Sequence, residues 1–179
     1  MHHSLRLYSR YRELFLRYYI FQAKWTRLPV IGRLVRNVAN FYGKKVSGAY
    51  LLTLQEAKEI VDSADWLALG PCTCRTVFKH CGNPINAEIM LSVGRNIFVE
   101  ERPHDYEEIT KGQAKEILSQ CHENGLIHTI IKCRQDFYAI CNCCSCCCVP
   151  LRLNKQYGIG NALLRKNNVV AEVKERQLS

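Results

Sequence analysis

The spacing of apolar residues predicts two consecutive helices near the N-terminus. From Leu5 to about Ala23, apolar and aromatic side chains recur every three or four positions, which is the spacing of one stripe on an amphipathic helix. The members of this stripe are Leu7, Tyr8, Tyr11, Leu14, Phe15, Tyr18 and Phe21. A similar pattern follows Pro29, a residue that suits a first helical turn, and Gly43 marks its end. We therefore expect two short helices within residues 1–45.

Two capping boxes predict helices further along the chain. In Thr53-Leu-Gln-Glu56 the threonine oxygen can accept from the backbone at Glu56 while the carboxylate returns to the threonine amide. This helix should run to about Ser63. Thr110-Lys-Gly-Gln113 repeats the device and predicts a helix that ends near Gly125.

Weaker signals suggest one more helix and several short strands. Asn83 resembles a helix cap, Pro84 suits the first turn, and Gly94 lies just past the expected end. Brief apolar stretches that fit strands or buried connectors are Asn96–Val99, Leu126–Ile131, Phe137–Ile140 and Val169–Val173. The predicted fold is mainly α with short strands or connectors (α+β), a small single domain organised around cysteine-rich metal-binding loops and preceded by a helical arm.

The positive charge of the chain is concentrated at the N-terminus. The formal net charge is +9, and residues 1–45 contain ten Lys and Arg against Glu13 alone, whereas residues 46–179 are balanced. The high pI therefore describes an arm and not a uniformly basic globule. We divide the chain into a basic amphipathic helical arm, 1–45, and a cysteine-rich domain, 46–179.

Cysteine is used for chemistry in this chain. There are eleven cysteines in 179 residues, and the segment CNCCSCCC places six of them in eight positions. Adjacent cysteines cannot easily bridge one another, an odd count leaves one unpaired, and charges interrupt every apolar run of an export signal in the first 21 residues. We expect reduced thiols in a cytoplasmic protein, where such clusters are usually metal ligands.

Nine thiols fall in two segments and form the candidate site. They are Cys72, Cys74, Cys81, Cys141, Cys143, Cys144, Cys146, Cys147 and Cys148. Thiolate sulfur suits zinc, cuprous copper or iron–sulfur clusters, so the residue type alone leaves the metal open. The Cys72-Thr-Cys74 spacing is tighter than a zinc knuckle, while nine thiols are enough for two tetrathiolate cubes with one left over.

An extended CNCCSCCC segment would direct its thiols to two sides. Alternation would then place Cys141, Cys143 and Cys147 on one side and Cys144, Cys146 and Cys148 on the other. In this hypothesis Cys72, Cys74 and Cys81 complete the two sets, which explains why two distant segments are needed.

The order of motifs resembles a known group of proteins. PCTCR, then CG, then a helix that opens with IT and ends in GLIH, then ICNCCSCCC is similar to a mostly uncharacterised group of prokaryotic [4Fe–4S]-binding proteins of ferredoxin type. The similarity covers about residues 50–160, and its most specific part is CNCCSCCC. The resemblance implies that all nine thiols take part in cluster binding, with one or two [4Fe–4S] clusters as the expected cofactor and zinc as the alternative.

Other residues near the motifs are weaker candidates. Cys121 and Cys133 fit buried packing positions, and His80 and His128 are more often packing or carbonyl-binding residues than ligands. Arg75 could balance the negative charge of a cluster and raise its potential, or could simply be solvated.

Three functions follow from these residues. The leading one is an electron-transfer protein that passes single electrons as a subunit or accessory of a larger redox complex, in the manner of an electron-transfer subunit of an oxidoreductase. The alternatives are a structural or regulatory metal-binding protein and a thiol/disulfide reductase with an open cluster site. No catalytic residue set emerges from the spacing.

The expected partners follow from the arm. A redox partner protein or larger complex is the first, and residues 1–27 also suit peripheral contact with the inner face of a membrane because aromatic residues alternate with cations. The same aromatics could instead pack on the protein's own core. Nucleic acid ranks last, since no nucleic-acid motif is present.

Overall fold

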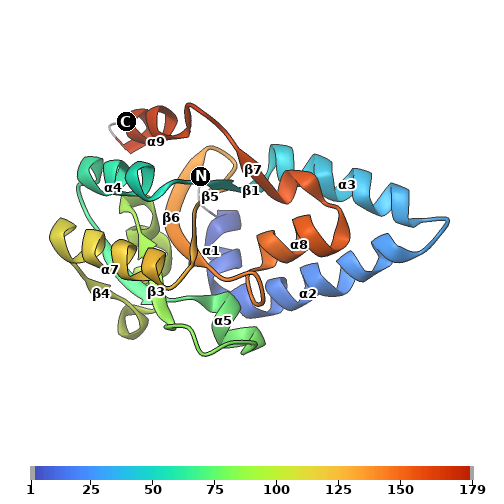
Figure 1. Ribbon diagram of the computed structural model, residues 1–179, viewed down its shortest axis with the longest axis horizontal. Coiled ribbons are helices and arrows are strands. Elements are labelled where there is room, and N and C mark those ends of the chain that lie inside the picture. Colours follow the sequence, from blue (N-terminus) through green and yellow to red (C-terminus); the bar gives the residue numbers. More distant parts are fainter. Residues whose placement is uncertain (1–2, 178–179) are drawn as a thin grey trace.

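The protein forms one mixed α/β domain built on a seven-stranded sheet (Figure 1). The structure is a computed structural model and describes residues 3–177. The helices are α1 (His3–Arg10), α2 (Arg12–Lys24), α3 (Gly32–Lys45), α4 (Leu54–Ser63), α5 (Thr73–Phe78), α6 (Ser92–Gly94), α7 (Lys111–Glu123), α8 (Val149–Tyr157) and α9 (Val169–Gln177). The strands are β1 (Ser47–Leu51), β2 (Ala68–Pro71), β3 (Asn86–Met90), β4 (Glu107–Glu108), β5 (Ile127–Cys133), β6 (Asp136–Cys143) and β7 (Leu163–Arg165). The prediction of a small α+β domain is confirmed.

The sheet has the strand order β4-β2-β3-β6-β5-β1-β7. Strands β5 and β6 form a central hairpin, β3 adds to β6 and β1 adds to β5, all antiparallel, while β7 joins β1 in parallel. Within this register Cys141 lies opposite Glu88 on one side and Thr129 on the other. The cysteine-rich end of β6 is therefore an interior position of the sheet.

The two faces of the sheet are covered by different helices. On one face α4, α7 and α9 pack their apolar stripes, including Ile60, Leu118 and Val173, against Ile130 and Ile140 of the sheet. The other face carries Cys141 and Cys143 and is covered by α5, α8 and the N-terminal helices (Figure 1). The thiols thus lie on the face that the N-terminal segment helps to close.

The predicted capping boxes are both present. Thr53 accepts from the Glu56 amide and begins α4, which ends at Ser63 as expected. Thr110 accepts from the Gln113 amide and begins α7. The predicted strands near 126–131 and 137–140 correspond to β5 and β6, which are longer than expected because they pair with each other.

One local prediction is wrong, and two segments that fitted strands or buried connectors are helical instead. The helix expected from Asn83 to Gly94 is mainly strand β3, because residues 87–90 are buried between two neighbouring strands and only α6 is helical. The segment Asn96–Val99 lies in a π-helical turn, Arg95–Val99. The segment Val169–Val173, which fitted a strand or a buried connector, begins α9, which inserts Val169 and Val173 into the core at helical spacing.

The N-terminal segment is divided differently from the predicted stripe. The first expected helix is interrupted at Tyr11, between α1 and α2. Helix α2 packs Leu16, Ile20 and Ala23 against α8 residues such as Val149. Most of the predicted stripe instead faces solvent; its exposed members are Leu7, Tyr11, Leu14, Tyr18 and Phe21.

Candidate metal centre

Four cysteines form a tight group, which we call the compact thiol site. Its members are Cys81, Cys144, Cys146 and Cys147, and their sulfurs all lie within 4.8 Å of one another. The Cys81 sulfur is 3.7 Å from that of Cys144 and 3.8 Å from that of Cys147, and the Cys146 and Cys147 sulfurs are also 3.8 Å apart. Four thiols at such distances can hold a metal ion or cluster.

The other five cysteines of the two segments form a second group, the buried thiol site. Its members are Cys72 and Cys74 at the start of α5, Cys141 and Cys143 at the end of β6, and Cys148 at the start of α8. Cys148 makes side-chain hydrogen bonds with Cys74 and Cys143, and Cys143 makes one with Cys141. Within residues 3–177, no three sulfurs of this group approach one another as closely as those of the compact thiol site.

A turn after β6 decides which cysteine joins which site. The strand ends at Cys143, and the Cys148 amide then donates to the Cys144 carbonyl at 3.1 Å. This turn places Cys147 with Cys144 and Cys146, and it returns Cys148 to Cys143. The alternation expected of an extended segment therefore does not hold beyond Cys143.

Arg75 lies between the two thiol sites. Its side chain is almost completely buried and donates to the carbonyl oxygens of Pro84 and Asn142. It also hydrogen-bonds Cys144 of the compact thiol site and faces Cys72 and Cys143 of the buried one. A single fixed positive charge thus neighbours both groups of thiols, and its burial rules out the alternative that Arg75 is simply solvated.

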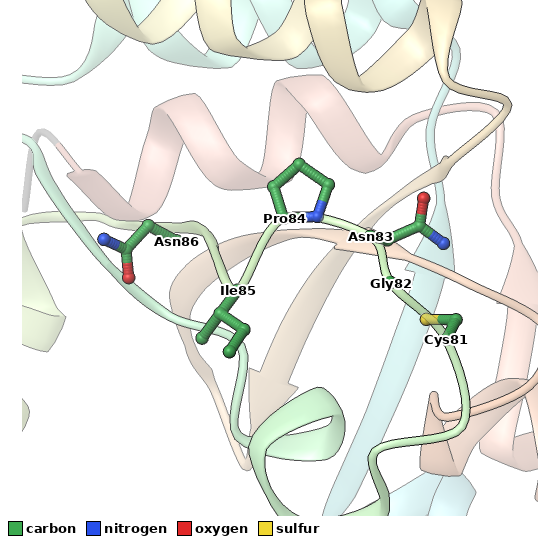
Figure 2. A pocket seen from close by; sticks show the side chains of 6 residues that line it. All are labelled: Cys81, Gly82, Asn83, Pro84, Ile85 and Asn86. Carbon is green, nitrogen blue, oxygen red and sulfur yellow. The ribbon is translucent and has the colours of Figure 1, made fainter.

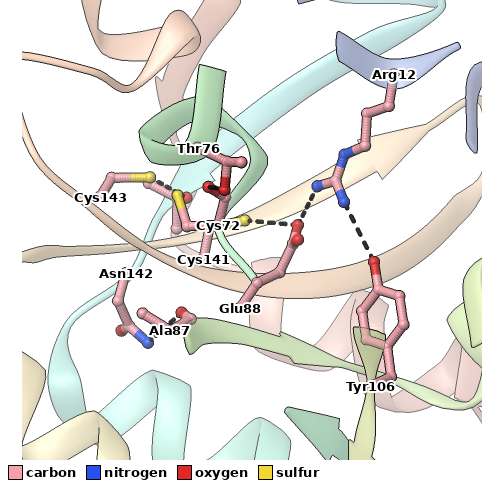
Figure 3. A network of polar contacts seen from close by, with 10 residues as sticks. Arg12, Cys72, Thr76, Ala87, Glu88, Tyr106, Cys141, Asn142 and Cys143 are labelled. Atoms are coloured by element: carbon pink, nitrogen blue, oxygen red, sulfur yellow. Dashed lines mark hydrogen bonds and ion pairs between the residues drawn. The ribbon is translucent and has the colours of Figure 1, made fainter. Parts of the chain in front are cut away.

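A buried ion pair closes the buried thiol site on its outer side (Figure 3). Arg12 of α2 pairs with Glu88 of β3 and donates to the Tyr106 hydroxyl at 3.4 Å. The Cys141 thiol donates to the Glu88 carboxylate at 3.3 Å, and Glu88 is only 1% exposed. Sequence reasoning missed both partners because Arg12 was counted with the basic arm and Glu88 was assigned to a helix.

Neighbouring groups divide the thiols into readily and reluctantly ionised ones. In the buried thiol site, hydrogen bonds from Cys141 and Cys148 hold the pKa of Cys143 well below its usual value, and a hydrogen bond from Cys148 lowers that of Cys74. In the compact thiol site burial acts to raise the pKa of Cys81, but hydrogen bonds from Asn83, Cys146 and Cys144 together outweigh it and lower this pKa to about 6. Each site thus contains at least one thiol that readily becomes a ligand anion.

No protein-family model, curated protein or solved structure matches this chain.

The compact thiol site adjoins an open hollow. The hollow has a volume of about 730 Å³ and is lined by the loop from Cys81 to Asn86, which Figure 2 shows with the Cys81 sulfur at one end. The exposed His80 also contacts the compact thiol site: its amide donates to the Cys147 sulfur at 3.3 Å and its ring nitrogen lies 3.1 Å from the Cys146 carbonyl oxygen. The compact thiol site is thus the more accessible of the two.

The remaining candidates take packing or positioning roles. His128 is buried and its Nδ1 lies 2.6 Å from the side-chain oxygen of Asn142, while the side-chain nitrogen of Asn142 donates to the Ala87 carbonyl oxygen. This arrangement fixes the strand between Cys141 and Cys143. Cys121 packs beside the compact thiol site and Cys133 lies in a separate apolar cluster; burial raises the pKa of both thiols.

Proposed function

We propose that this protein is an iron–sulfur protein that passes single electrons as a subunit or accessory of a larger redox complex. The observation that carries the proposal is the gathering of nine thiols from two remote segments into two adjacent sites on either side of Arg75. All eleven cysteines are free thiols. Two neighbouring thiolate centres suit stepwise movement of one electron between a buried and a more accessible position.

We infer from the hollow beside Cys81 where a redox partner would approach. The compact thiol site borders this hollow, whereas the buried thiol site is covered by α5, α8 and the Arg12–Glu88 pair. We infer that a partner protein docks over the Cys81–Asn86 loop and exchanges electrons through the compact thiol site. We place this activity in the reducing cytoplasm, at or near the inner face of the membrane.

A zinc-binding role is the second candidate, and the spacing of the compact thiol site favours it. Four sulfurs placed tetrahedrally about 2.3 Å from one ion are about 3.8 Å apart. The separations of 3.7 and 3.8 Å between three pairs of sulfurs agree with this, and all four sulfurs lie within 4.8 Å of one another. A cube carries its thiolates on four separate irons and needs wider spacing. The spacing of the compact thiol site therefore favours a single ion of zinc or iron, and a cluster would then be held by the buried thiol site.

Metal analysis of protein purified without oxygen tests the proposal. We expect iron together with acid-labile sulfide, a brown colour that dithionite bleaches, and a paramagnetic signal from the reduced cluster. One tetrahedral ion in addition to a cluster would agree with an ion in the compact thiol site and a cluster in the buried thiol site. A colourless protein that contains stoichiometric zinc and no sulfide would contradict electron transfer and support the structural role.

Replacing Arg75 with glutamine is expected to lower the reduction potential of the bound centre. The guanidinium stabilises the more negative, reduced state, so its loss should shift the potential by about 60 mV or more, the equivalent of about 1.4 kcal/mol for one electron. Redox titration followed by paramagnetic resonance measures this shift. Arg33→Gln on exposed α3 is the matched control, and equal potentials in the two variants would refute a role for Arg75.

A further inference from the structure

Exposed apolar side chains are concentrated in the N-terminal helices. Of the fourteen large apolar side chains that are exposed in the described part of the chain, thirteen lie between Leu7 and Tyr42 and the fourteenth is Ile85. Single exposed apolar residues are ordinary on a protein surface, but a contiguous group marks an interaction site. The N-terminal helices therefore carry a surface that the protein's own core leaves uncovered.

The uncovered surface extends along a helical hairpin formed by α2 and α3. The inner side of α2 is already used, because Leu16 and Ile20 pack against α8. Its outer side presents Leu14, Tyr18 and Phe21 to solvent at helical spacing. Packing on the core thus accounts for the side of α2 that carries Leu16 and Ile20 and leaves the side with Tyr18 and Phe21 uncovered.

The most exposed group lies where the hairpin turns. We call Trp25, Leu28, Val30, Ile31 and Leu34 the apolar tip; Val30 is 86% exposed and Leu34 is 65% exposed. Figure 1 shows this turn at the end of the molecule farthest from the sheet. The turn is tightly built, since a Cβ on Gly32 would lie 2.3 Å from the Thr26 carbonyl oxygen, and Arg36 donates to the same oxygen at 2.5 Å. The apolar tip is thus held in place at a projecting position.

Cations surround the apolar tip. Lys24, Arg27 and Arg33 are exposed beside it, and the only acidic residue within residues 1–45 is Glu13. Arg12 does not belong to this set because Glu88 neutralises it in the interior. Apolar and aromatic side chains flanked by Lys and Arg are typical of helices that lie in the boundary between headgroups and acyl chains.

We propose that the α2–α3 hairpin docks on an anionic lipid surface, with the apolar tip in the headgroup boundary and Lys24, Arg27 and Arg33 on lipid phosphates. Helices of 13 and 14 residues are too short to cross a bilayer, which needs about 20. Among residues 3–177 no helix has the length and apolar character of a membrane span. The hairpin thus lies on the surface, and this inference does not depend on which metal the thiols hold.

Vesicle sedimentation with the full-length, metal-loaded protein tests the docking. Truncating the arm would also remove Arg12 and Leu16 from the interior, so point substitutions at exposed positions are the better variants. We expect the protein to sediment with vesicles that contain phosphatidylglycerol, and more weakly with phosphatidylcholine alone. The double variant Val30→Ser/Leu34→Ser should lower the partition constant about tenfold or more. Lys24→Gln/Arg33→Gln should lower it about 25-fold at low salt, about fivefold per cation.

The matched control is Leu7→Ser, which removes an apolar side chain of 48% exposure on α1, outside the α2–α3 hairpin, and should leave sedimentation unchanged. Circular dichroism and metal content check that each variant is folded. Failure of the wild-type chain to sediment with anionic vesicles would overturn the proposal. So would equal sedimentation of Val30→Ser/Leu34→Ser, or salt-insensitive binding to neutral vesicles. Self-association that is lost in Val30→Ser/Leu34→Ser, without vesicle binding, would assign the apolar tip to a second copy of the chain.

Discussion

Replacing Cys147 with serine should release the metal of the compact thiol site and leave that of the buried thiol site in place. Cys147 is fully buried, its sulfur lies 3.8 Å from those of Cys81 and Cys146, and it accepts from the His80 amide. A serine hydroxyl is a poor ligand for zinc or iron, because it is harder than a thiolate and is not ionised at neutral pH. Replacing a residue that only hydrogen-bonds a metal ligand typically lowers metal affinity about 10- to 100-fold. Because Cys147 would itself be a ligand, we expect affinity to fall by more than about 100-fold.

The experiment compares three serine variants by metal content and competition with a chelator. Cys147→Ser should lose the tightly spaced ion, whereas Cys143→Ser should lose the metal of the buried thiol site. Cys133→Ser is the control, because Cys133 lies outside both sites and its thiol packs in another apolar cluster. If Cys147→Ser and Cys143→Ser each lost all metal, the nine thiols would form one shared centre and the division into two sites would be wrong.

Local signals predicted the elements that local contacts stabilise. Each capping box depends on residues three positions apart, so Thr53 and Glu56 determine the start of α4 almost independently of the rest of the chain. Strand β3 shows the opposite case. Asn83 and Pro84 imitate a helix start, but pairing with β2 and β6 buries the following residues on both faces and outweighs the local preference.

The ligand candidates could be named from sequence, but their grouping could not. Cysteine density is visible in any reading of CNCCSCCC, whereas the partition depends on the turn that joins Cys144 to Cys148. The charged residues beside the sulfurs were harder still to predict from the sequence. Arg12 and Glu88 are 76 positions apart, and nothing in the sequence indicates that they meet.

The N-terminal stripe predicted helices but not which of their faces is buried. Its three- and four-residue spacing correctly indicated amphipathic helices, but periodicity does not say which face is covered. The inner face of α2 consists of Arg12, Leu16, Ile20 and Ala23, so a buried cation belongs to the core-facing side and the aromatics largely to the outer one. The arm is consequently both a cover for the thiol face and a candidate docking element.

Replacing Glu88 with glutamine should destabilise the folded protein by about 3–5 kcal/mol, the cost of leaving one member of a buried ion pair uncompensated. Glutamine keeps the shape and an acceptor for the Cys141 thiol, but it leaves the charge of Arg12 unbalanced in the interior. Urea unfolding under oxygen-free conditions, followed by circular dichroism with metal content matched between samples, measures the loss. Arg12→Met/Glu88→Leu should recover most of it, since replacing both partners by apolar residues removes the unpaired charge.

The control for this experiment is an ion pair of similar length on the surface. Lys115 and Asp62 are 2.5 Å apart but largely exposed, so Asp62→Asn should cost about 1 kcal/mol or less. The contrast between the two pairs follows from solvation, because water screens the surface charges and is excluded from Glu88. A Glu88→Gln variant as stable as Asp62→Asn would mean that α2 does not seal the thiol face through Arg12, and the N-terminal helices would then be an independent arm.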